Sequence, residues 1–319
     1  MSSIFSISIL QSALEQGCIY ALVALALYIS FSILNLCDLS TDGCFTLGCA
    51  VCAQVALAGH PFLSLLAAMA AGVCSGFITA TLQTKLGVQS ILAGIIVNTG
   101  LYTVNLAVMG IGSKGGFSSS INMFQSVTVF DLAKTHLSPV VGGWYKLIVA
   151  AGVVLLVGVL IVLFLGTRLG LSVRATGDNT DMVKASSINP AFTITVGLCL
   201  SNSLTGLAGG LLGQYQKSCE INLGTGMVTI ALASLIIGET LIGKGGVMRH
   251  VFGVILGSCI YRIIIAVALR MNVDASCLKL VSACIVAIAI ASPAFKDKLA
   301  FQKRKMTAMN ARKGGTRGC

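Results

Sequence analysis

The sequence predicts an all-α fold in which about nine helices form a polytopic transmembrane bundle. Of the 319 residues, 56% are hydrophobic and only 10% are charged. Mean hydropathy is +0.94, far above the range of water-soluble globular domains. A chain with so few polar side chains cannot cover a water-facing surface, so composition and hydropathy together indicate an integral membrane protein. The third observation is a series of apolar segments long enough to cross a bilayer.

One helix needs about 20 predominantly apolar residues to cross the hydrocarbon layer. About nine segments, within a range of about 8–10, meet this condition, and they lie at residues 8–34, 43–59, 62–82, 90–110, 145–166, 191–214, 226–242, 248–269 and 278–294. The second and seventh segments are short and rich in glycine, so each is a candidate for a broken or re-entrant helix. The parts of the chain that contain these two segments, 42–110 and 222–294, share one pattern: a polar start, a short apolar segment and then longer spans. Such a repeat is common in transporters.

Glycine pairs at helix-packing spacing occur in three of the spans. A glycine every fourth residue allows two helix backbones to approach closely inside a membrane, where the hydrophobic effect does not drive helices together. We expect close helix contacts at Gly72 and Gly76, at Gly209 and Gly213, and at Gly253 and Gly257.

Basic residues predict the orientation, because cytoplasmic loops are enriched in Lys and Arg. If the N-terminus is outside and the C-terminus is cytoplasmic, the main basic segments fall on the cytoplasmic side. They are Lys85, the 168–184 loop, Lys244 with Arg249, and the tail from 296 to 319. The long 111–144 loop then faces outward. We divide the chain into a transmembrane domain, 1–295, and a basic cytoplasmic tail, 296–319. A basic tail can also bind nucleic acid, but the positive-inside bias accounts for this one, so we expect no nucleic-acid partner.

Residues 238–245 read GETLIGKG, which approaches the phosphate-binding pattern G-x-x-x-x-G-K-[ST]. The position that requires a hydroxyl for magnesium is occupied by Gly245, and the preceding residues form an apolar span rather than a strand. We therefore predict a tight turn and no ATP site in this chain. The twelve cysteines are scattered through apolar segments, including Cys49 and Cys52, and fit small buried side chains better than a redox or metal site. No enzymatic activity, metal or cofactor is expected.

The loop 167–190 is polar and charged, yet it carries apolar residues such as Leu171, Met182 and Val183. We expect a short amphipathic helix over 178–188, with Asp178 as its N-cap and Pro190 starting the next span. Such a helix can lie on the lipid surface or dock into a groove of a partner protein, and its periodicity does not decide between them.

Within this loop, residues 174–189 read RATGDNTDMVKASSIN. The stretch resembles the cytoplasmic loop of ABC importer permeases of the branched-chain amino-acid and ribose family, R-A-x-G-x-N followed by an Ala and then G-I-N. The matching residues are Arg174, Ala175, Gly177, Asn179, Ala185, Ile188 and Asn189, whereas Ser187 stands where Gly is usual. The resemblance implies that this segment, which includes Asp178, docks into a cleft of a separate ATPase subunit.

A second stretch, DLSTDGCFTLG at residues 38–48, resembles the D-L-S/T-x-D-G-x-F-x-L-G motif of one branch of that family, which is associated with amino-acid-like substrates. Residues 17–24, GCIYALVA, resemble the family's first span. The likeness covers most of residues 10–295. It implies a multi-pass permease of the inner or plasma membrane, paired with an identical or homologous permease, an ATPase and an extracytoplasmic substrate-binding protein.

Polar residues inside the spans are candidates for the translocation path, because charges there are costly. Our candidates are Asp38, Asp42, Asn98 and Asn202. For each Asn the alternative is an interhelical hydrogen bond, and for each Asp it is helix capping at a membrane edge. Acidic groups within the spans are few, which favours a path without tight ion sites. We expect import of a small polar solute, an amino acid before a nucleoside or sugar. An ion-coupled transporter or channel and a membrane scaffold without transport are the rival functions.

Overall fold

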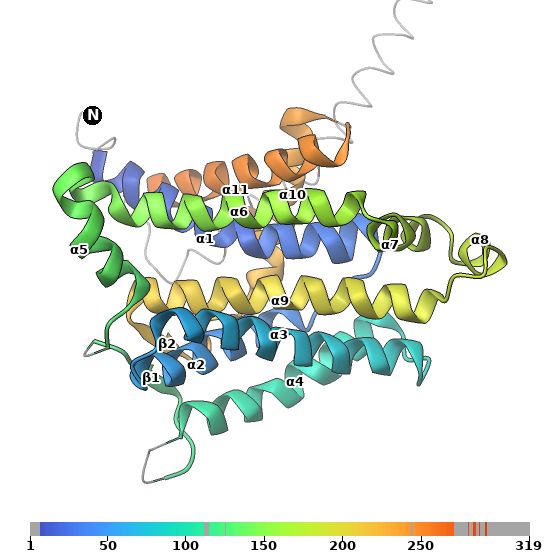
Figure 1. Ribbon diagram of the computed structural model, residues 1–319, viewed down its shortest axis with the longest axis horizontal. Helices are drawn as coiled ribbons and strands as arrows, with labels where there is room; N and C mark the ends of the chain where they lie inside the picture. The colour runs from blue at the N-terminus through green and yellow to red at the C-terminus, as the bar shows by residue number, and fades with distance from the viewer. Residues whose placement is uncertain are drawn as a thin grey trace, which may run out of the picture.

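The structure is a computed structural model, and it describes residues 7–111, 115–124, 126–243 and 245–270, with the single positions 280, 283, 284, 287 and 291. Helices dominate it (Figure 1). They are α1 Ile7–Leu27, its π-helical continuation η1 Tyr28–Ile33, α2 Thr41–Leu57, α3 Pro61–Thr84, α4 Ser90–Met109, α5 Val129–Val141, the short 3-10 helix η2 Gly142–Trp144, α6 Tyr145–Gly166, α7 Arg168–Asp178, α8 Thr180–Ala185, α9 Pro190–Gln216, α10 Met227–Ile242 and α11 Val247–Arg270.

Six of the described helices are long and apolar enough to cross a membrane, and α2 and α10 are shorter apolar helices. Each of these helices coincides with one of the first eight predicted segments, to within a few residues at each end. The ninth predicted segment, 278–294, and the basic tail, 296–319, lie outside the described residues apart from single positions. The predicted multi-pass helical bundle is therefore confirmed, whereas the count of nine and the orientation in the membrane stay predictions.

The expectation of a purely helical chain needs one correction. The strands β1 Ser120–Asn122 and β2 Ser218–Glu220 pair antiparallel, with Ile121 opposite Cys219. Each strand leaves the end of a long helix at the same end of the bundle, where backbone groups that are no longer paired within a helix need other partners. The predicted outer loop 111–144 also contains α5, whose first turn holds Asp131.

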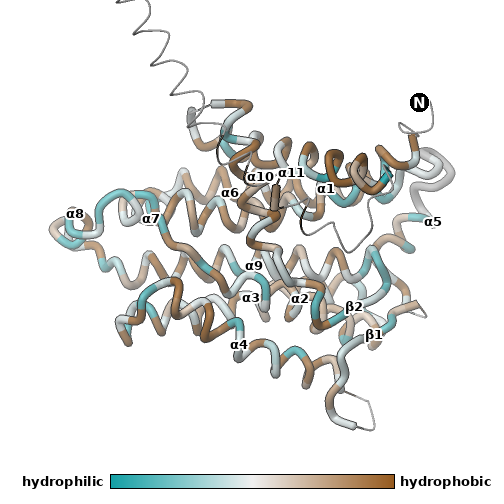
Figure 2. The backbone as a smooth tube through the Cα atoms, turned by 180° about the vertical axis from the view of Figure 1, so that it is seen from behind, coloured by the Kyte–Doolittle hydropathy of each residue, from teal (hydrophilic) through white to brown (hydrophobic). Residues whose placement is uncertain are grey.

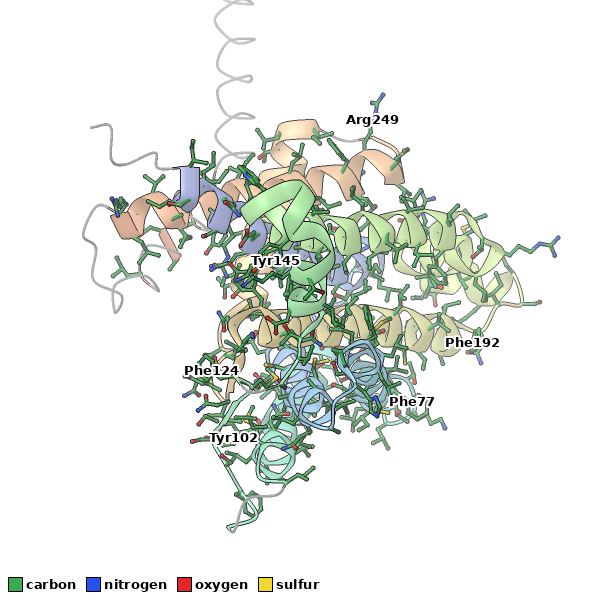
Figure 3. All side chains as sticks on the ribbon, turned by 60° about the vertical axis from the view of Figure 1, so that its left-hand side comes forward. Phe77, Tyr102, Phe124, Tyr145, Phe192 and Arg249 are labelled. Carbon is green, nitrogen blue, oxygen red and sulfur yellow. The ribbon has the colours of Figure 1, made fainter. Side chains whose placement is uncertain are left out.

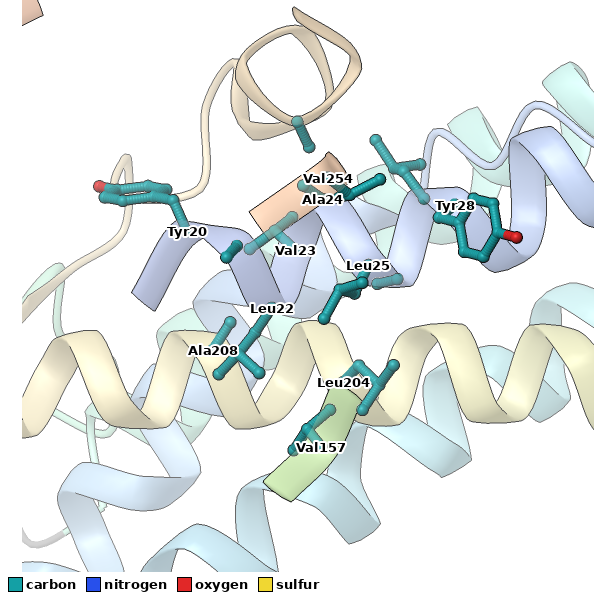
Figure 4. Packing of buried hydrophobic residues seen from close by; sticks show 14 of the residues in the cluster. Tyr20, Leu22, Val23, Ala24, Leu25, Tyr28, Val157, Leu204, Ala208 and Val254 are labelled. Atoms are coloured by element: carbon teal, nitrogen blue, oxygen red, sulfur yellow. The ribbon is translucent and has the colours of Figure 1, made fainter. Parts of the chain in front are cut away.

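The bundle is built around α1. Of its most apolar stretch 78% is buried, against 28% for α4 and for α6. Figure 4 shows Leu22 and Leu25 of α1 facing Ala208 and Leu204 of α9. The surfaces of α3, α4 and α6 carry many exposed large apolar side chains, and Figure 2 shows the same predominance of hydrophobic residues along the helices. A surface of this kind is suited to lipid rather than to water.

The glycine pairs lie at close helix contacts, as predicted. A side chain at Gly72 would meet the backbone of Asn202, and one at Gly76 would meet the backbone of Leu198. Because the order of contacts reverses, α3 and α9 run antiparallel. Gly209 lies against the carbonyl of Phe45, and Gly257 lies against α10.

Basic segments far apart in the sequence meet at one end of the bundle. Lys85 follows α3 and, through the antiparallel packing of α3, lies near the beginning of α9. Arg174 and Gly245 line one cavity, which brings the α10–α11 turn beside α7. In Figure 1 this end carries α7 and α8, whereas α5 and the two strands occupy the opposite end. We call these the α7–α8 end and the α5 end.

The two short helices both begin inside the bundle. Asp38, just before α2, is hydrogen-bonded to Asn202 near the middle of α9. The first turn of α2 in turn contacts the first turn of α10 through Asp42. From this meeting point α2 runs towards β1 and β2, and α10 runs towards the α7–α8 end. The second and seventh predicted segments are thus shorter helices, of 17 and 16 residues, with their N-termini together.

Candidate functional site

The segment 167–190 folds into two helices rather than the single helix over 178–188 that the sequence predicted. Thr167 caps α7 by accepting a hydrogen bond from the N–H of Gly170 at 3.2 Å. Asp178 is the last residue of α7, so its prediction as an N-cap is wrong. The cap of α8 is the next residue, Asn179, whose Oδ1 accepts from the N–H groups of Asp181 and Met182, both at 3.0 Å.

The end of this segment is also organised by an asparagine. The Oδ1 of Asn189 accepts a hydrogen bond of 3.0 Å from the N–H of Ala191, and Pro190 occupies the first turn of α9. The predicted restart at Pro190 is confirmed. Ser187 adopts a left-handed backbone with φ of 59°. This conformation favours glycine, which explains why a Gly is usual at this position in the family that the loop resembles.

α7 is fastened to the bundle along one face. Gly177 packs against the carbonyl oxygen of Ile33, and a methyl group at position 177 would overlap that oxygen. The side chain of Asn35 donates a hydrogen bond of 2.9 Å to the carbonyl of Gly177. On the other side, the hydroxyls of Thr176 and Thr193 are 2.7 Å apart and join α7 to α9.

The opposite face of the segment is free in the monomer. Arg174, Asp178, Asn179, Ala185 and Asn189 are exposed, and Ala175, Gly177 and Ile188 are half-buried. Of the apolar residues, Val173 and Val183 are buried, whereas Leu171 is 53% and Met182 is 67% exposed. The predicted candidates therefore form a surface at the α7–α8 end with apolar and charged side chains, although Asn179 and Asn189 act as helix caps within it.

Arg174 and Asp178 also face inward to a cavity of about 230 Å³. The cavity is completed by Tyr28, Ser32, Glu239 and His250. The Tyr28 ring stacks on the imidazole of His250 with 6.0 Å between centroids, and the hydroxyl of Ser32 donates to Glu239 at 3.3 Å. Side chains of η1, α7, α10 and α11 thus meet directly beneath the exposed segment.

The GETLIGKG stretch does not form a phosphate loop. Glu239 lies within α10, which ends at Ile242, so a helix precedes the turn where a phosphate loop requires a strand. Gly243 has a positive φ of 76°, as expected for a tight turn. Lys244 lies outside the described residues.

Of the four residues predicted to line a path, Asp38 and Asn202 bind each other. The amide of Asn202 donates to the carboxylate of Asp38 at 2.9 Å, and that carboxylate also accepts from the N–H and the hydroxyl of Ser40 at 2.8 and 2.6 Å. Both side chains are fully buried, at 1% and 0% exposure. In this conformation Asn202 makes the interelement hydrogen bond that was the alternative for it. Asp38 bonds to Ser40, which precedes α2, and does not cap that helix. Neither residue lines the cavity that contains the other two.

Asp42 and Asn98 do come together. Asp42, in the first turn of α2, accepts hydrogen bonds from the N–H groups of Gly226 and Val228 at 2.9 and 3.0 Å, so it caps α10. A carboxylate is favourable at such a helix start. Asn98 faces Gly43 from α4. Asp42 and Asn98 line one cavity of about 300 Å³ together with residues from the turn before α10. Its polar lining includes Asp42, Thr46, Asn98, Tyr102, Asn105 and Thr225.

Sequence reasoning did not select Tyr102 and Asn105 as path residues. Asn98, Tyr102 and Asn105 follow the i, i+4, i+7 spacing of one helix face, and this polar spacing within an apolar span is the signal that could have identified them. Figure 3 places Tyr102 on α4, on the opposite side of the bundle from Arg249. Arg262, a charged residue within α11, was also missed; its guanidinium lies 3.5 Å from the ring centroid of Tyr20.

The chain matches the family model described as branched-chain amino acid transport system, permease component, over residues 9–290. It is 32% identical to the tyrosine transport system permease protein of Clostridioides difficile over 276 residues, 86% of this chain and 88% of that protein. Over 263 residues it is 25% identical to the ribose import permease of Escherichia coli, 79% of this chain and 76% of that protein. No solved structure matches. The matched region contains the Asp38–Asn202 pair, the cavity of Asp42 and Asn98, and the α7–α8 segment. The chain is a multi-pass helical bundle that belongs to the family of branched-chain amino acid transport system permease components.

Proposed function

We propose that this chain is the permease subunit of an ATP-driven ABC importer of the inner or plasma membrane, with an amino acid as its cargo. The observation that carries the proposal is the α7–α8 segment. It presents Arg174, Asp178 and Met182 outward at one end of the bundle, and it is fastened to η1 and the residues after it through Gly177. An exposed surface with a rigid attachment can receive force from a docked ATPase and pass it to the membrane helices.

A chain of contacts leads from this surface to the polar cavity. Arg174 and Asp178 share the inner cavity with Glu239 of α10. The far end of α10 is held by Asp42, which lines the polar cavity with Asn98. Movement of α7 towards or away from the bundle axis would therefore tilt α10 and change the surroundings of Asp42. In our proposal this is how ATP-driven closure of the ATPases alternates access to the path.

The remaining partners follow from the family and from the names of its members. We propose a second permease, identical or homologous, across the central path, and an extracytoplasmic binding protein that delivers the solute at the α5 end. An amino acid is favoured over a sugar because the relative with 32% identity is a tyrosine transport permease, whereas the ribose permease is 25% identical. The DLSTDG stretch at 38–43, which contains Asp38 and Asp42, points in the same direction.

The docking role is tested by reversing two of the charges on the exposed face, Arg174→Glu with Asp178→Arg. We expect the folded variant to lose co-purification with its ATPase and to lose ATP-dependent amino-acid uptake in proteoliposomes. Lys85→Glu is the matched control, since it reverses a charge at the same end of the bundle outside the α7–α8 segment. Wild-type recovery of the ATPase with the double variant would overturn the docking assignment. Uptake that persists without ATP and follows an ion gradient would overturn the ABC importer itself.

A further inference from the structure

The cavity between α2, α4 and the turn before α10 contains a buried acceptor without a partner. Asn105 is 1% exposed and lines this cavity. Its amide nitrogen donates a hydrogen bond of 3.1 Å to the carbonyl of Gly43. Its carbonyl oxygen, Oδ1, has no hydrogen-bond partner in the described part of the chain. A buried acceptor without a donor lowers the stability of the fold. A molecule in the cavity that donates a hydrogen bond to this oxygen would remove that cost.

The same cavity contains a carboxylate without a cationic partner. The Asp42 carboxylate accepts hydrogen bonds from the N–H groups of Gly226 and Val228, and the N–H of Met227 also interacts with it. A carboxylate has about four acceptor sites, so at least one remains. No Lys, Arg or His is among the residues that line the cavity, and neither ion pair found in the described residues involves Asp42. The first turns of α2 and α10 offset part of the negative charge, but they do not supply donors to the remaining lone pairs.

The cavity has one polar exposed side. Tyr102 is 51% exposed, and Thr99, Asn222 and Thr225 are also exposed around the same opening. Asn98, which shares the cavity, lies near the middle of α4. Hydroxyl and amide groups at this depth are unsuited to lipid, which favours the proposed central path on this side of the bundle. A volume of about 300 Å³ is at the lower end of small-molecule sites.

We propose that this cavity binds the primary ammonium end of a small solute on its way through the permease, with Asn105 Oδ1 and the Asp42 carboxylate as acceptors. An ammonium group offers three N–H donors and a positive charge, and so satisfies the unpaired oxygen and balances the carboxylate together. A sugar hydroxyl can donate to the Asn105 oxygen, but it carries no positive charge to balance the Asp42 carboxylate. The inference rests on the proposed import function, and it makes Asn105 a specificity-determining residue that selects amino acids over sugars.

The test measures ligand binding by the full-length permease alone, reconstituted in lipid nanodiscs, as a shift of its thermal unfolding midpoint. The probes are the proteinogenic amino acids singly at millimolar concentration, the responding amino acid's analogue without its amino group, and ribose. We expect at least one amino acid to raise the midpoint by about 2 °C, with no rise from the deaminated analogue or from ribose. An equal shift with the deaminated analogue, a shift with ribose in place of the amino acids, or no shift with any amino acid overturns the proposal.

Three variants assign the shift to the Asn105 oxygen. Asn105→Leu removes the acceptor, and we expect affinity to fall at least about tenfold. Asn105→Asp keeps an acceptor of the same size; it loses the donor to Gly43 and adds a second carboxyl group that can accept from an ammonium, so binding should persist. If Asn105 had only a structural role, Asn105→Leu and Asn105→Asp should reduce ligand affinity equally. Gln54→Leu is the matched control, because Gln54 also joins α2 to α4, through a 2.8 Å bond to the carbonyl of Val108, outside the cavity.

Unchanged amino-acid binding by Asn105→Leu would show that the cavity holds only water at this oxygen, and it would overturn the site. This result would leave the import function standing, because the assay contains neither ATP nor the ATPase. Failure of the import function has a different signature, namely uptake by the assembled complex that does not require ATP.

Discussion

The side-chain amide of Asn202 donates a hydrogen bond of 2.9 Å to the carboxylate of Asp38, across 164 positions of the chain. The pair joins the middle of α9 to the irregular segment that precedes α2. Both residues are buried, so this contact holds the segment before α2 against α9, and Asp42 in the first turn of α2 caps α10.

Removal of this amide should destabilise the bundle. Asn202→Leu leaves the Asp38 carboxylate buried with only the donors of Ser40, and we expect a loss of about 1.5–3 kcal/mol. The measurement is the unfolding midpoint in detergent or nanodiscs. The exchange Asp38→Asn with Asn202→Asp restores a donor and an acceptor in reversed order and should recover most of the loss. An unchanged midpoint for Asn202→Leu would contradict the role of the pair.

The cap of α9 should contribute to stability rather than to ATPase docking. Asn189→Ala removes the acceptor for the N–H of Ala191, and we expect a loss of about 1 kcal/mol, seen as a lower unfolding midpoint. Asn189→Ser keeps a capping oxygen and should behave like the wild type. Co-purification of the ATPase with the folded Asn189→Ala variant should be retained, and its complete loss would assign Asn189 to the docking surface itself.

The left-handed backbone of Ser187 makes a prediction with a definite sign. Ser187→Gly should be tolerated with a midpoint equal to or above that of the wild type, because glycine adopts a φ of 59° without steric cost. Ser187→Val should be less stable by about 1–2 kcal/mol, since a branched side chain is strained there. Thermal unfolding of the two variants side by side checks this. A valine variant as stable as the glycine variant would exclude the left-handed turn.

Close packing of α7 on η1 should be sensitive to a single methyl group. Gly177→Ala would place that group on the carbonyl oxygen of Ile33, and we expect a loss of about 1–3 kcal/mol from the displaced helix, together with reduced ATP-dependent uptake. Gly166→Ala is the matched control, because no atom lies within 4 Å of a side chain built there. Equal behaviour of the two variants would contradict a rigid attachment of α7.

At the α5 end, Asp131 and Lys217 form an ion pair of 2.8 Å between α5 and the segment after α9. Burial alone would raise the pKa of Asp131, but hydrogen bonds from Lys217 and Thr128 outweigh it, so the pKa is lowered. A lowered folded pKa means that the stabilisation is present above the unfolded value of about 3.9 and is lost as the pH falls through the folded value. The midpoint of the wild type should therefore approach that of Asp131→Asn below about pH 4. A difference between the two proteins that stays constant as the pH falls well below the lowered folded pKa would exclude the pair as its source.

The sequence alone determined the membrane class, the position of each described span and the boundary at Asn189 and Pro190, because these depend on local hydropathy and on local turn chemistry. It misplaced one cap by a single residue, since Asp178 and Asn179 are both good capping residues. Only the tertiary structure decided that Asp38 pairs with Asn202 and that Asp42 shares a cavity with Asn98 and Asn105. The physical reason is that helices which are apolar all round have no hydrophobic face to show which side lies inward. Their rotation is determined instead by glycine contacts and buried hydrogen bonds between residues far apart in the chain.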